Sequence, residues 1–202
     1  MSPVAAAARA RLDAGRAEIL ARHRAGAGGQ EVVRSISALT DDVVQQMFAA
    51  ICAELGGAVP SSATVQARAG ALPSEVGAGA RVDAAVRVDA DGSVADSGPL
   101  ALIATGGYGR RELSPRSDVD LLALLPPEDA PAAARARADA VAERFHRALW
   151  DADLEAGFAA RTLPQTLALA REDHTARMAL LDCRLIVGDS KLYKELERAM
   201  VT

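Results

Sequence analysis

Residues 102–125 read LIATGGYGRRELSPRSDVDLLALL, and the rest of the predicted fold is organised around this segment. Its apolar start predicts a short buried strand, and the glycine-rich segment that follows predicts a tight turn whose backbone can approach a ligand. The stretch ends in a second strand, which opens with Asp118 and Asp120 and continues as a run of leucines. Such an apolar run is typical of a central strand that is buried on both faces.

Asp118 and Asp120 are two residues apart at the start of the second strand. Side chains at i and i+2 of a strand share one face, about 7 Å apart along the chain, so both carboxylates are expected to point the same way. Two such charges repel each other unless a cation joins them, and a pair of carboxylates suits Mg²⁺. The alternative is a strand-entry turn with solvated acids. We predict that both residues bind metal and act in catalysis.

The glycine-rich segment supplies the second part of the predicted site. Backbone amides of a concave turn bind anions, so Gly106 and Gly107 are expected to bind nucleotide phosphates. Arg110 is expected to add a charge-assisted contact to phosphate, with a solvated surface arginine as the alternative. Ser117 would either donate to a phosphate or cap the turn. A metal site beside a phosphate site indicates phosphoryl or nucleotidyl transfer.

Other phosphate-binding motifs fit this segment poorly. No Gly-Lys-Ser/Thr follows the glycines, and no third glycine completes a dinucleotide-binding fingerprint. The sequence therefore disfavours P-loop and Rossmann sites.

Two glycines, ten intervening residues and Asp-x-Asp at the start of an apolar strand resemble the DNA polymerase β-type nucleotidyltransferase superfamily. Within it, the chain resembles the N-terminal catalytic domain of the bacterial PII-protein uridylyltransferases, which attach UMP to a tyrosine of the PII signalling protein. Residues 106–122 carry this closer resemblance. Two further blocks, residues 149–162 and 179–189, agree with the same family in the same order.

This resemblance implies a fold and an activity. The fold is α+β: a small mixed sheet with helices on one side, preceded by an N-terminal helical hairpin. The activity is Mg²⁺-dependent transfer of UMP from UTP to a PII-type nitrogen-signalling protein, with release of pyrophosphate. Two alternatives stay open: another nucleotidyltransferase of this fold, such as a small-molecule or toxin-modifying adenylyltransferase, and a catalytically silent domain that binds nucleotide or a partner. No residue recognisably reads the base, so base preference and acceptor also stay open.

The superfamily uses a third carboxylate on an adjacent strand. Asp151, Asp153 and Glu155 all lie near the strand expected at residues 153–160. Glu155 has the right parity only if Leu154 and Ala156 face the core. The sequence does not choose among the three.

Two residues depart from the family pattern. Arg111 stands where the family usually has glycine, so it would be strained if its φ were positive, or it would add a phosphate contact. Phe158 stands where the family has histidine. Both substitutions raise the question of whether this copy is impaired.

The chain is predicted to contain three parts. Residues 1–56 form an N-terminal helical segment, with helices at 4–24 and at 30–55; the latter is one helix or a pair divided after Thr40. Residues 57–99 are rich in glycine and alanine and predict a linker or insertion, with a possible hairpin at Asp91-Gly92. Residues 100–202 form the nucleotidyltransferase domain.

Within that last part, apolar periodicity predicts several elements after the second strand. We expect Phe145 and Trp150 in the core. The expected elements are a helix at 129–150, a strand at 153–160, a helix from Pro164 capped by Thr162, a helix through 178–186 that ends at Gly188, and a last helix from about Ser190.

Composition limits the class of protein. With 202 residues the chain is long enough for one sizeable core and a smaller appendage. A net charge of −4 argues against a general nucleic-acid binder. Two cysteines without zinc spacing fit a reducing cytoplasm, and no apolar run approaches the roughly 18 residues of a membrane span. We therefore expect a cytoplasmic protein whose partners are a nucleoside triphosphate and a PII-type protein, with neither nucleic acid nor membrane among them.

Overall fold

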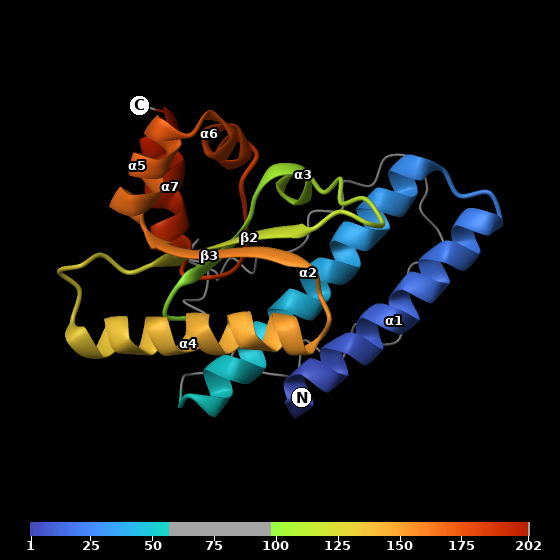
Figure 1. The fold of residues 1–202 in the computed structure, drawn as a ribbon, viewed down its shortest axis with the longest axis horizontal. Coiled ribbons are helices and arrows are strands. Elements are labelled where there is room, and N and C mark those ends of the chain that lie inside the picture. The colour runs from blue at the N-terminus through green and yellow to red at the C-terminus, as the bar shows by residue number, and fades with distance from the viewer. Residues whose placement is uncertain (57–97, 202) are drawn as a thin grey trace, which may run out of the picture.

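The computed structural model describes residues 1–56 and 98–201. The chain begins with two long helices, α1 (Pro3–Arg24) and α2 (Gly29–Glu54), which lie side by side (Figure 1). The prediction of an α+β fold that begins with a helical hairpin is confirmed. The later elements are β1 (Ala101–Ala104), α3 (Gly106–Gly109), β2 (Val119–Leu125), α4 (Ala132–Asp151), β3 (Ala156–Thr162), α5 (Leu163–Glu172), α6 (His174–Leu181), β4 (Arg184–Gly188) and α7 (Ser190–Val201).

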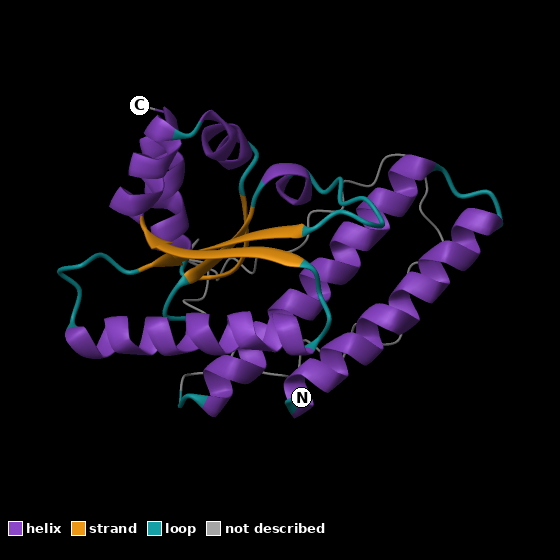
Figure 2. Cartoon of the chain, viewed as in Figure 1, coloured by secondary structure: helices purple, strands orange, loops and turns teal. Residues whose placement is uncertain are grey.

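The strands form a four-stranded mixed sheet in the order β3-β2-β1-β4 (Figure 2). β1 is antiparallel to both of its neighbours, whereas β2 and β3 run parallel. The parallel pair needs a crossover, which α4 supplies. β1 and β2 occupy the centre of the sheet, as their apolar sequences predict.

Helices cover both faces of the sheet, and not one face as predicted. Leu102 and Ala104 of β1 pack in a core with residues of α1, α2 and α4. Ala101 and Ile103, which point the other way, pack with residues of α5, α6 and α7. Figure 1 shows these two helical layers on opposite sides of the sheet. Central strands that are apolar on both sides expose apolar surface unless each face is covered.

The second predicted helix is one continuous helix, so a pair divided after Thr40 is wrong. Asp41 lies inside α2 and is 9% exposed. The apolar positions of α2 continue without a change of phase through this point, so burial favours a single helix. The hairpin is tightly packed, because a Cβ at Gly15 of α1 would lie 2.5 Å from Cδ1 of Leu39 on α2.

The helix predicted through 178–186 is also wrong. α6 ends at Leu181, and residues 184–188 form β4, which pairs with β1. Leu181, Leu185 and Ile186 have helical spacing, but the free edge of β1 gives this segment backbone partners that a helix would leave unused. β3 begins at Ala156 and extends to Thr162, later than predicted.

Two remaining expectations concern the core and the surface. Phe145 is fully buried as predicted, but Trp150 is 76% exposed on α4 and does not belong to the core. The hairpin expected at Asp91-Gly92, and all of the expected linker before residue 98, lie outside the described residues. Within the described residues, no helix combines the length and the apolar character that crossing a bilayer requires.

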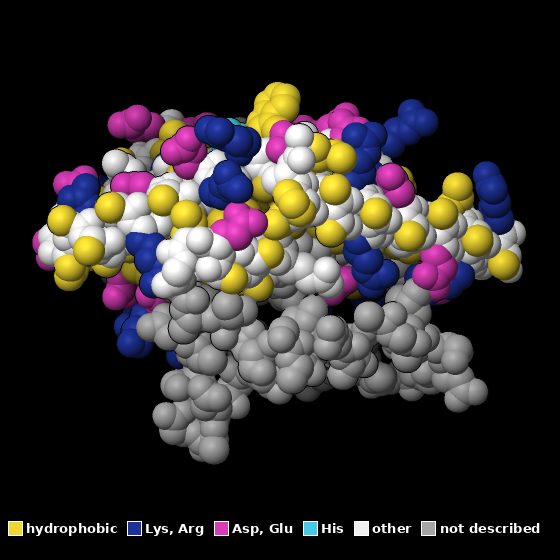
Figure 3. Space-filling view, turned by 90° about the horizontal axis from the view of Figure 1, so that it is seen from below, with side chains coloured by type: hydrophobic (Ala, Val, Ile, Leu, Met, Phe, Trp, Pro, Cys, Tyr) yellow, Lys and Arg dark blue, Asp and Glu magenta, His cyan; other side chains and the backbone are white. Residues whose placement is uncertain are grey.

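The face of the molecule that includes α4 carries charges of both signs. Figure 3 shows Lys and Arg interspersed with Asp and Glu over the described part of this face, without a broad basic area. Nucleic-acid binders usually present a basic patch.

Candidate functional site

Asp120 lies where β2 meets both α3 and β3. Its backbone carbonyl accepts a hydrogen bond from the amide of Thr105, the residue before α3, at 3.1 Å. On the other side, the sheet register pairs it with Gly157 of β3. A Cβ at Gly106 would lie 3.7 Å from Oδ2 of Asp120, and a Cβ at Gly157 would lie 2.7 Å from Oδ1. The carboxylate therefore lies between these two glycines.

Asp118 is exposed just before β2, close to Asp120. The pKa of Asp120 is raised, first by partial burial of its carboxyl group and second by the negative charge of Asp118. Among the residues that the structure describes, neither carboxylate makes an ion pair or a side-chain hydrogen bond. Two repelling carboxylates without a cationic partner fit a hard divalent cation with oxygen ligands.

These two carboxylates do not form a complete metal site by themselves. Within residues 1–56 and 98–201, no three His, Cys, Asp or Glu side chains gather closely enough to hold one ion. Mg²⁺ commonly binds through one or two carboxylates, with substrate phosphates and water as further ligands. The pair fits that type of site.

The glycine segment is a single helical turn, α3, where a tight turn was predicted. Gly106 has φ +58°, which glycine adopts without strain. The amides of Gly106 and Gly107 make no hydrogen bond with the described backbone. First-turn amides lack partners within a helix, so these groups can donate to phosphate oxygens.

Arg110 and Ser117 have partners of their own. Arg110 donates from Nη1 to Asp182 and from Nε to Glu112, the latter at 3.1 Å. These carboxylates raise the pKa of Arg110, with Asp182 the larger cause. The Ser117 hydroxyl donates to the carbonyl of Ser114 at 3.1 Å, so in this structure it caps the turn. To contact a phosphate, Arg110 would have to release a carboxylate, and Ser117 would have to release the carbonyl of Ser114.

Glu155 points away from the core formed by its two neighbours in the chain, as a third carboxylate of the site requires. Leu154 is 5% exposed, and Ala156 packs against the same core, so both face the helices α2 and α4. Glu155 is exposed, and its carbonyl accepts from the amide of Val119 at 3.0 Å. This bond extends the parallel register and aligns Glu155 with Asp118 along the two chains.

The other two candidates contact the N-terminal helix. Asp153 has φ +57° and lies 3.2 Å from Nη2 of Arg9. Asp151 accepts from the amide of Ser2 at 3.4 Å. Glu155 is therefore the best placed of the three.

Arg111 and Phe158, the two departures from the family pattern, affect different parts of the structure. Arg111 has φ +62°, so an arginine occupies a left-handed conformation where the family usually has glycine. The ring of Phe158 stacks on His146 at 4.9 Å between centroids and lies 6.0 Å from the Phe145 centroid. Both partners belong to α4, so Phe158 faces away from Asp120. Position 158 does not line the space between the carboxylates and α3.

A cavity of about 470 Å³ adjoins the residues around Asp118. Ser117 and Val119, the neighbours of Asp118 in the chain, line it, whereas the glycines of α3 do not. Arg16, Arg116 and Glu155 are also among its lining residues. A cavity of this size and mixed character suits a polar ligand or a peptide side chain.

Comparison with known proteins gives this site its context. The sequence pattern of the family described as "Putative nucleotidyltransferase DUF294" matches residues 16–159, which include both aspartates and α3. The chain belongs to the DUF294 nucleotidyltransferase family. The matched region also includes Glu155 and Gly157, so it spans the whole candidate site of this family member.

This DUF294 protein is also homologous to the N-terminal region of bifunctional uridylyltransferase/uridylyl-removing enzymes, as its motifs predict. It is 35% identical over 183 residues to the enzyme of Phenylobacterium zucineum (strain HLK1), an alignment that covers 90% of this chain and 16% of that enzyme. It is 35% identical over 193 residues to that of Burkholderia orbicola (strain AU 1054), covering 96% of this chain and 17% of the relative. The chain thus spans about one sixth of the length of these relatives.

Proposed function

We propose that this protein is a Mg²⁺-dependent nucleotidyltransferase that transfers UMP from UTP to a tyrosine of a PII-type signalling protein. The observation that carries the proposal is the place of the Asp120 carboxylate, between Gly106 and Gly157 and within the electrostatic influence of Asp118. Membership of a nucleotidyltransferase family supports the reaction class, and homology to uridylyltransferases supports UTP as the donor.

Each residue of the site has a proposed role. Asp118 and Asp120 would hold Mg²⁺, which neutralises charge on the phosphates. The amides of Gly106 and Gly107 donate to the β- and γ-phosphates, and Arg110 adds positive charge on the same side. Glu155 is the proposed base for the acceptor hydroxyl, because it is exposed and in register with Asp118.

The reaction is an in-line displacement. The tyrosine oxygen attacks the α-phosphorus and loses its proton to the base. As the new oxygen–phosphorus bond forms, the bond from the α-phosphorus to the oxygen that bridges the β-phosphorus breaks, and pyrophosphate leaves. We assign the acceptor to the cavity lined by Ser117 and Glu155, because it adjoins Asp118 and is not bounded by the glycines of α3.

Intact-mass spectrometry tests this proposal. The protein is incubated with UTP, MgCl₂ and a purified PII protein. We expect the PII protein to gain one UMP, and we expect the gain to disappear in Asp118→Asn and without Mg²⁺. Asp129→Asn, which changes an exposed aspartate in the β2–α4 connection, is the matched control and should keep the activity.

A second candidate function is nucleotide binding without transfer. It is favoured by the observation that no third side chain completes a metal-binding group within the described residues. Mg²⁺-dependent binding of UTP without modification of the PII protein would support this reading. Modification with ATP in place of UTP would instead support an adenylyltransferase.

A further inference from the structure

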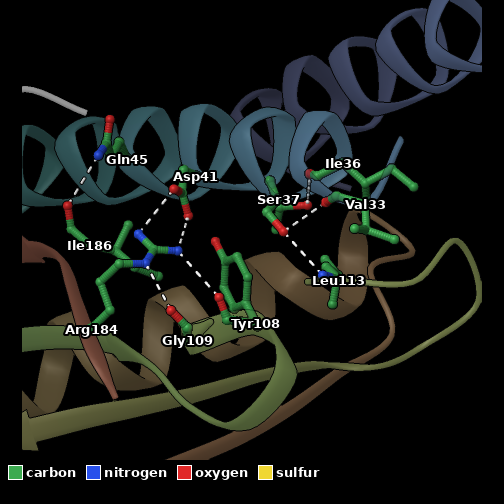
Figure 4. Close-up of polar contacts among 11 residues, drawn as sticks. Val33, Ile36, Ser37, Asp41, Gln45, Tyr108, Gly109, Leu113, Arg184 and Ile186 are labelled. Atoms are coloured by element: carbon green, nitrogen blue, oxygen red, sulfur yellow. Dashed lines mark hydrogen bonds and ion pairs between the residues drawn. The ribbon is translucent and has the colours of Figure 1, made fainter. Parts of the chain in front are cut away.

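Three polar residues recur every fourth position along one side of α2: Ser37, Asp41 and Gln45. This spacing places their side chains on one face of the helix, directed at the sheet domain (Figure 4). Together they contact two segments beyond residue 100, the loop at Leu113 and the strand β4. Ser37 Oγ accepts from the Leu113 amide at 3.1 Å, Asp41 pairs with Arg184, and Gln45 Nε2 donates to the Ile186 carbonyl at 3.0 Å.

The central contact is a two-bond ion pair between Asp41 and Arg184 of β4. Nη1 and Nη2 of the guanidinium donate to the two carboxylate oxygens, each at 3.0 Å. The side chains are only 19% and 12% exposed. A planar, two-bond pair that is this deeply buried holds its two side chains in one relative orientation far better than a surface ion pair does.

Arg184 also contacts the glycine helix. Its Nε donates to the carbonyl of Gly109 at 3.3 Å, and Nη2 donates to that of Tyr108 at 3.4 Å. The guanidinium carbon lies 5.5 Å from the centroid of the Tyr108 ring. The same arginine thus connects α2, through Asp41, to the last residues of α3.

Tyr108, a residue of α3 itself, packs its side chain towards α2. It is 1% exposed, and its hydroxyl points towards Asp41 in Figure 4. Burial of the hydroxyl raises the pKa of Tyr108, and the charge of Asp41 raises it further. Tyr108 is therefore a neutral, packed side chain at the junction of α2 and α3.

The C-terminal end of α3 has little room to move. A Cβ at Gly109 would overlap the carbonyl oxygen of Asp182, and Arg110 is paired with the carboxylate of the same residue. A single turn with three glycines has high backbone entropy and is not stable alone. Its position beside Asp120 therefore depends on contacts from outside it, and Arg184 supplies several of them.

We propose that Asp41 and Arg184 are positioning residues, which keep α3 at the distance from Asp120 that Mg²⁺–triphosphate binding requires. The proposal rests on the proposed function, since it concerns the same site. Neither residue contacts the substrate. On this view α2 is part of the nucleotide site, because removing the Asp41 carboxylate charge releases the arginine that orients α3.

The test compares Asp41→Asn and Arg184→Lys with the wild type. Calorimetry measures the dissociation constant of UTP with Mg²⁺, and kinetics with the PII protein separates KM from kcat. A small misplacement of binding groups can cost up to about 100-fold, so we expect affinity to fall about 10-fold or more, with a smaller change in kcat at saturating UTP. Arg184→Lys keeps the positive charge but loses the forked guanidinium, so its UTP affinity should also be lower than that of the wild type.

Glu54→Gln is the matched control. It breaks another ion pair of α2, to Arg144 of α4 at 3.2 Å, which does not involve α3. We expect its UTP affinity to equal that of the wild type. A second measurement, amide hydrogen exchange of residues 106–112, should show faster exchange in Asp41→Asn and Arg184→Lys and no change in Glu54→Gln.

Two results would overturn the proposal: unchanged UTP affinity in a folded Asp41→Asn or Arg184→Lys protein, or an equal loss in Glu54→Gln. Should one of the two site variants fail to fold, the other decides. If the wild type itself binds no UTP with Mg²⁺, the proposed function fails. Hydrogen exchange then decides the positioning role separately, because equal protection of residues 106–112 in all variants contradicts it.

Discussion

At the scale of single residues, the chemistry of the site depends on the charge of Asp120. Its pKa is raised above the ordinary value by partial burial and by the charge of Asp118. A carboxyl group with a raised pKa in the folded state binds its proton more tightly there than in the unfolded chain, so the ionised form destabilises the folded protein. This penalty is fully present at pH 7 and shrinks as pH falls through the raised pKa towards the unfolded value.

The first prediction follows from that sign. In EDTA at pH 7, Asp120→Asn should raise the free energy of unfolding by a few tenths to about 1 kcal/mol, because it removes a repulsive like-charge contact. Urea denaturation at pH 7 and at pH 3 measures it. The advantage of the variant should decrease at the lower pH, and a variant that is less stable at pH 7 contradicts the account.

A second prediction concerns Gly157. A Cβ there would lie 2.7 Å from Oδ1 of Asp120, so Gly157→Ala should displace the flexible carboxylate while the strand remains intact. Perturbing the surroundings of a metal ligand typically costs about 10–100-fold in metal affinity, and we expect Mg²⁺-dependent UTP binding to weaken by that order. Gly28→Ala, whose Cβ meets nothing within 4 Å, is the control. Equal affinity in both variants would mean that the Asp120 carboxylate does not bind the metal.

The third prediction tests the backbone at Arg111. Its φ of +62° costs a residue with a Cβ roughly 1–2 kcal/mol of folded-state stability. Glycine adopts this φ without that strain, but its larger conformational entropy in the unfolded chain offsets part of the gain. Compared with Arg111→Ala, which also lacks the guanidinium but keeps the Cβ, Arg111→Gly should therefore have a free energy of unfolding higher by about 0.5–1 kcal/mol. Arg116→Gly in the following loop, where φ is not positive, should give no such gain in the same denaturation experiment.

At the scale of elements, β4 is the one that sequence periodicity misses. Gly188 ends this strand with φ +106°, and a Cβ there would overlap the carbonyl oxygen of Leu100. Gly188→Ala therefore combines backbone strain with a clash against backbone, and we expect a loss of about 2–4 kcal/mol in thermal or urea unfolding. Wild-type stability in this variant would contradict the pairing of β4 with β1.

The elements that could be predicted are those whose apolar pattern has a single interpretation. The long stripe of α2 and the leucine run of β2 are of this kind, and both form as expected. Residues 184–188 are not, because Leu185 and Ile186 fit a helix until the free edge of β1 is known. Trp150 directly follows the buried Leu149, but it lies outside the buried stripe of α4, where its indole N–H donates to His146 at 3.2 Å and its side chain stays mostly exposed.

The same limit applies to the site. The spacing of Asp118 and Asp120 after the glycines predicts their proximity without a structure. The importance of Gly157 and the orientation of Phe158 depend on the register of β3 against β2, which no local pattern specifies. The contacts of Asp41 depend on how α2 packs against α3 and β4, although the recurrence of polar residues at every fourth position of an apolar helix is a signal in the sequence.

At the scale of the whole molecule, the candidate site lies where three parts of the chain meet. α2 contacts α3 and β4 through Asp41, β2 and the residue before it contribute the two carboxylates, and β3 contributes Gly157, which leaves room for Asp120. Helices cover both faces of the sheet, and α3 lies at the end of β1 and the start of β2, next to Asp120 (Figure 1).

Calorimetric titration of UTP into the protein, with and without Mg²⁺, shows whether Asp118, Asp120 and α3 form a nucleotide site. We expect saturable binding to one site that requires Mg²⁺ and is lost in both Asp118→Asn and Asp120→Asn, while Asp129→Asn binds as the wild type does. UTP binding that persists without Mg²⁺ or in both site variants would contradict it, as would a wild-type protein that binds no UTP.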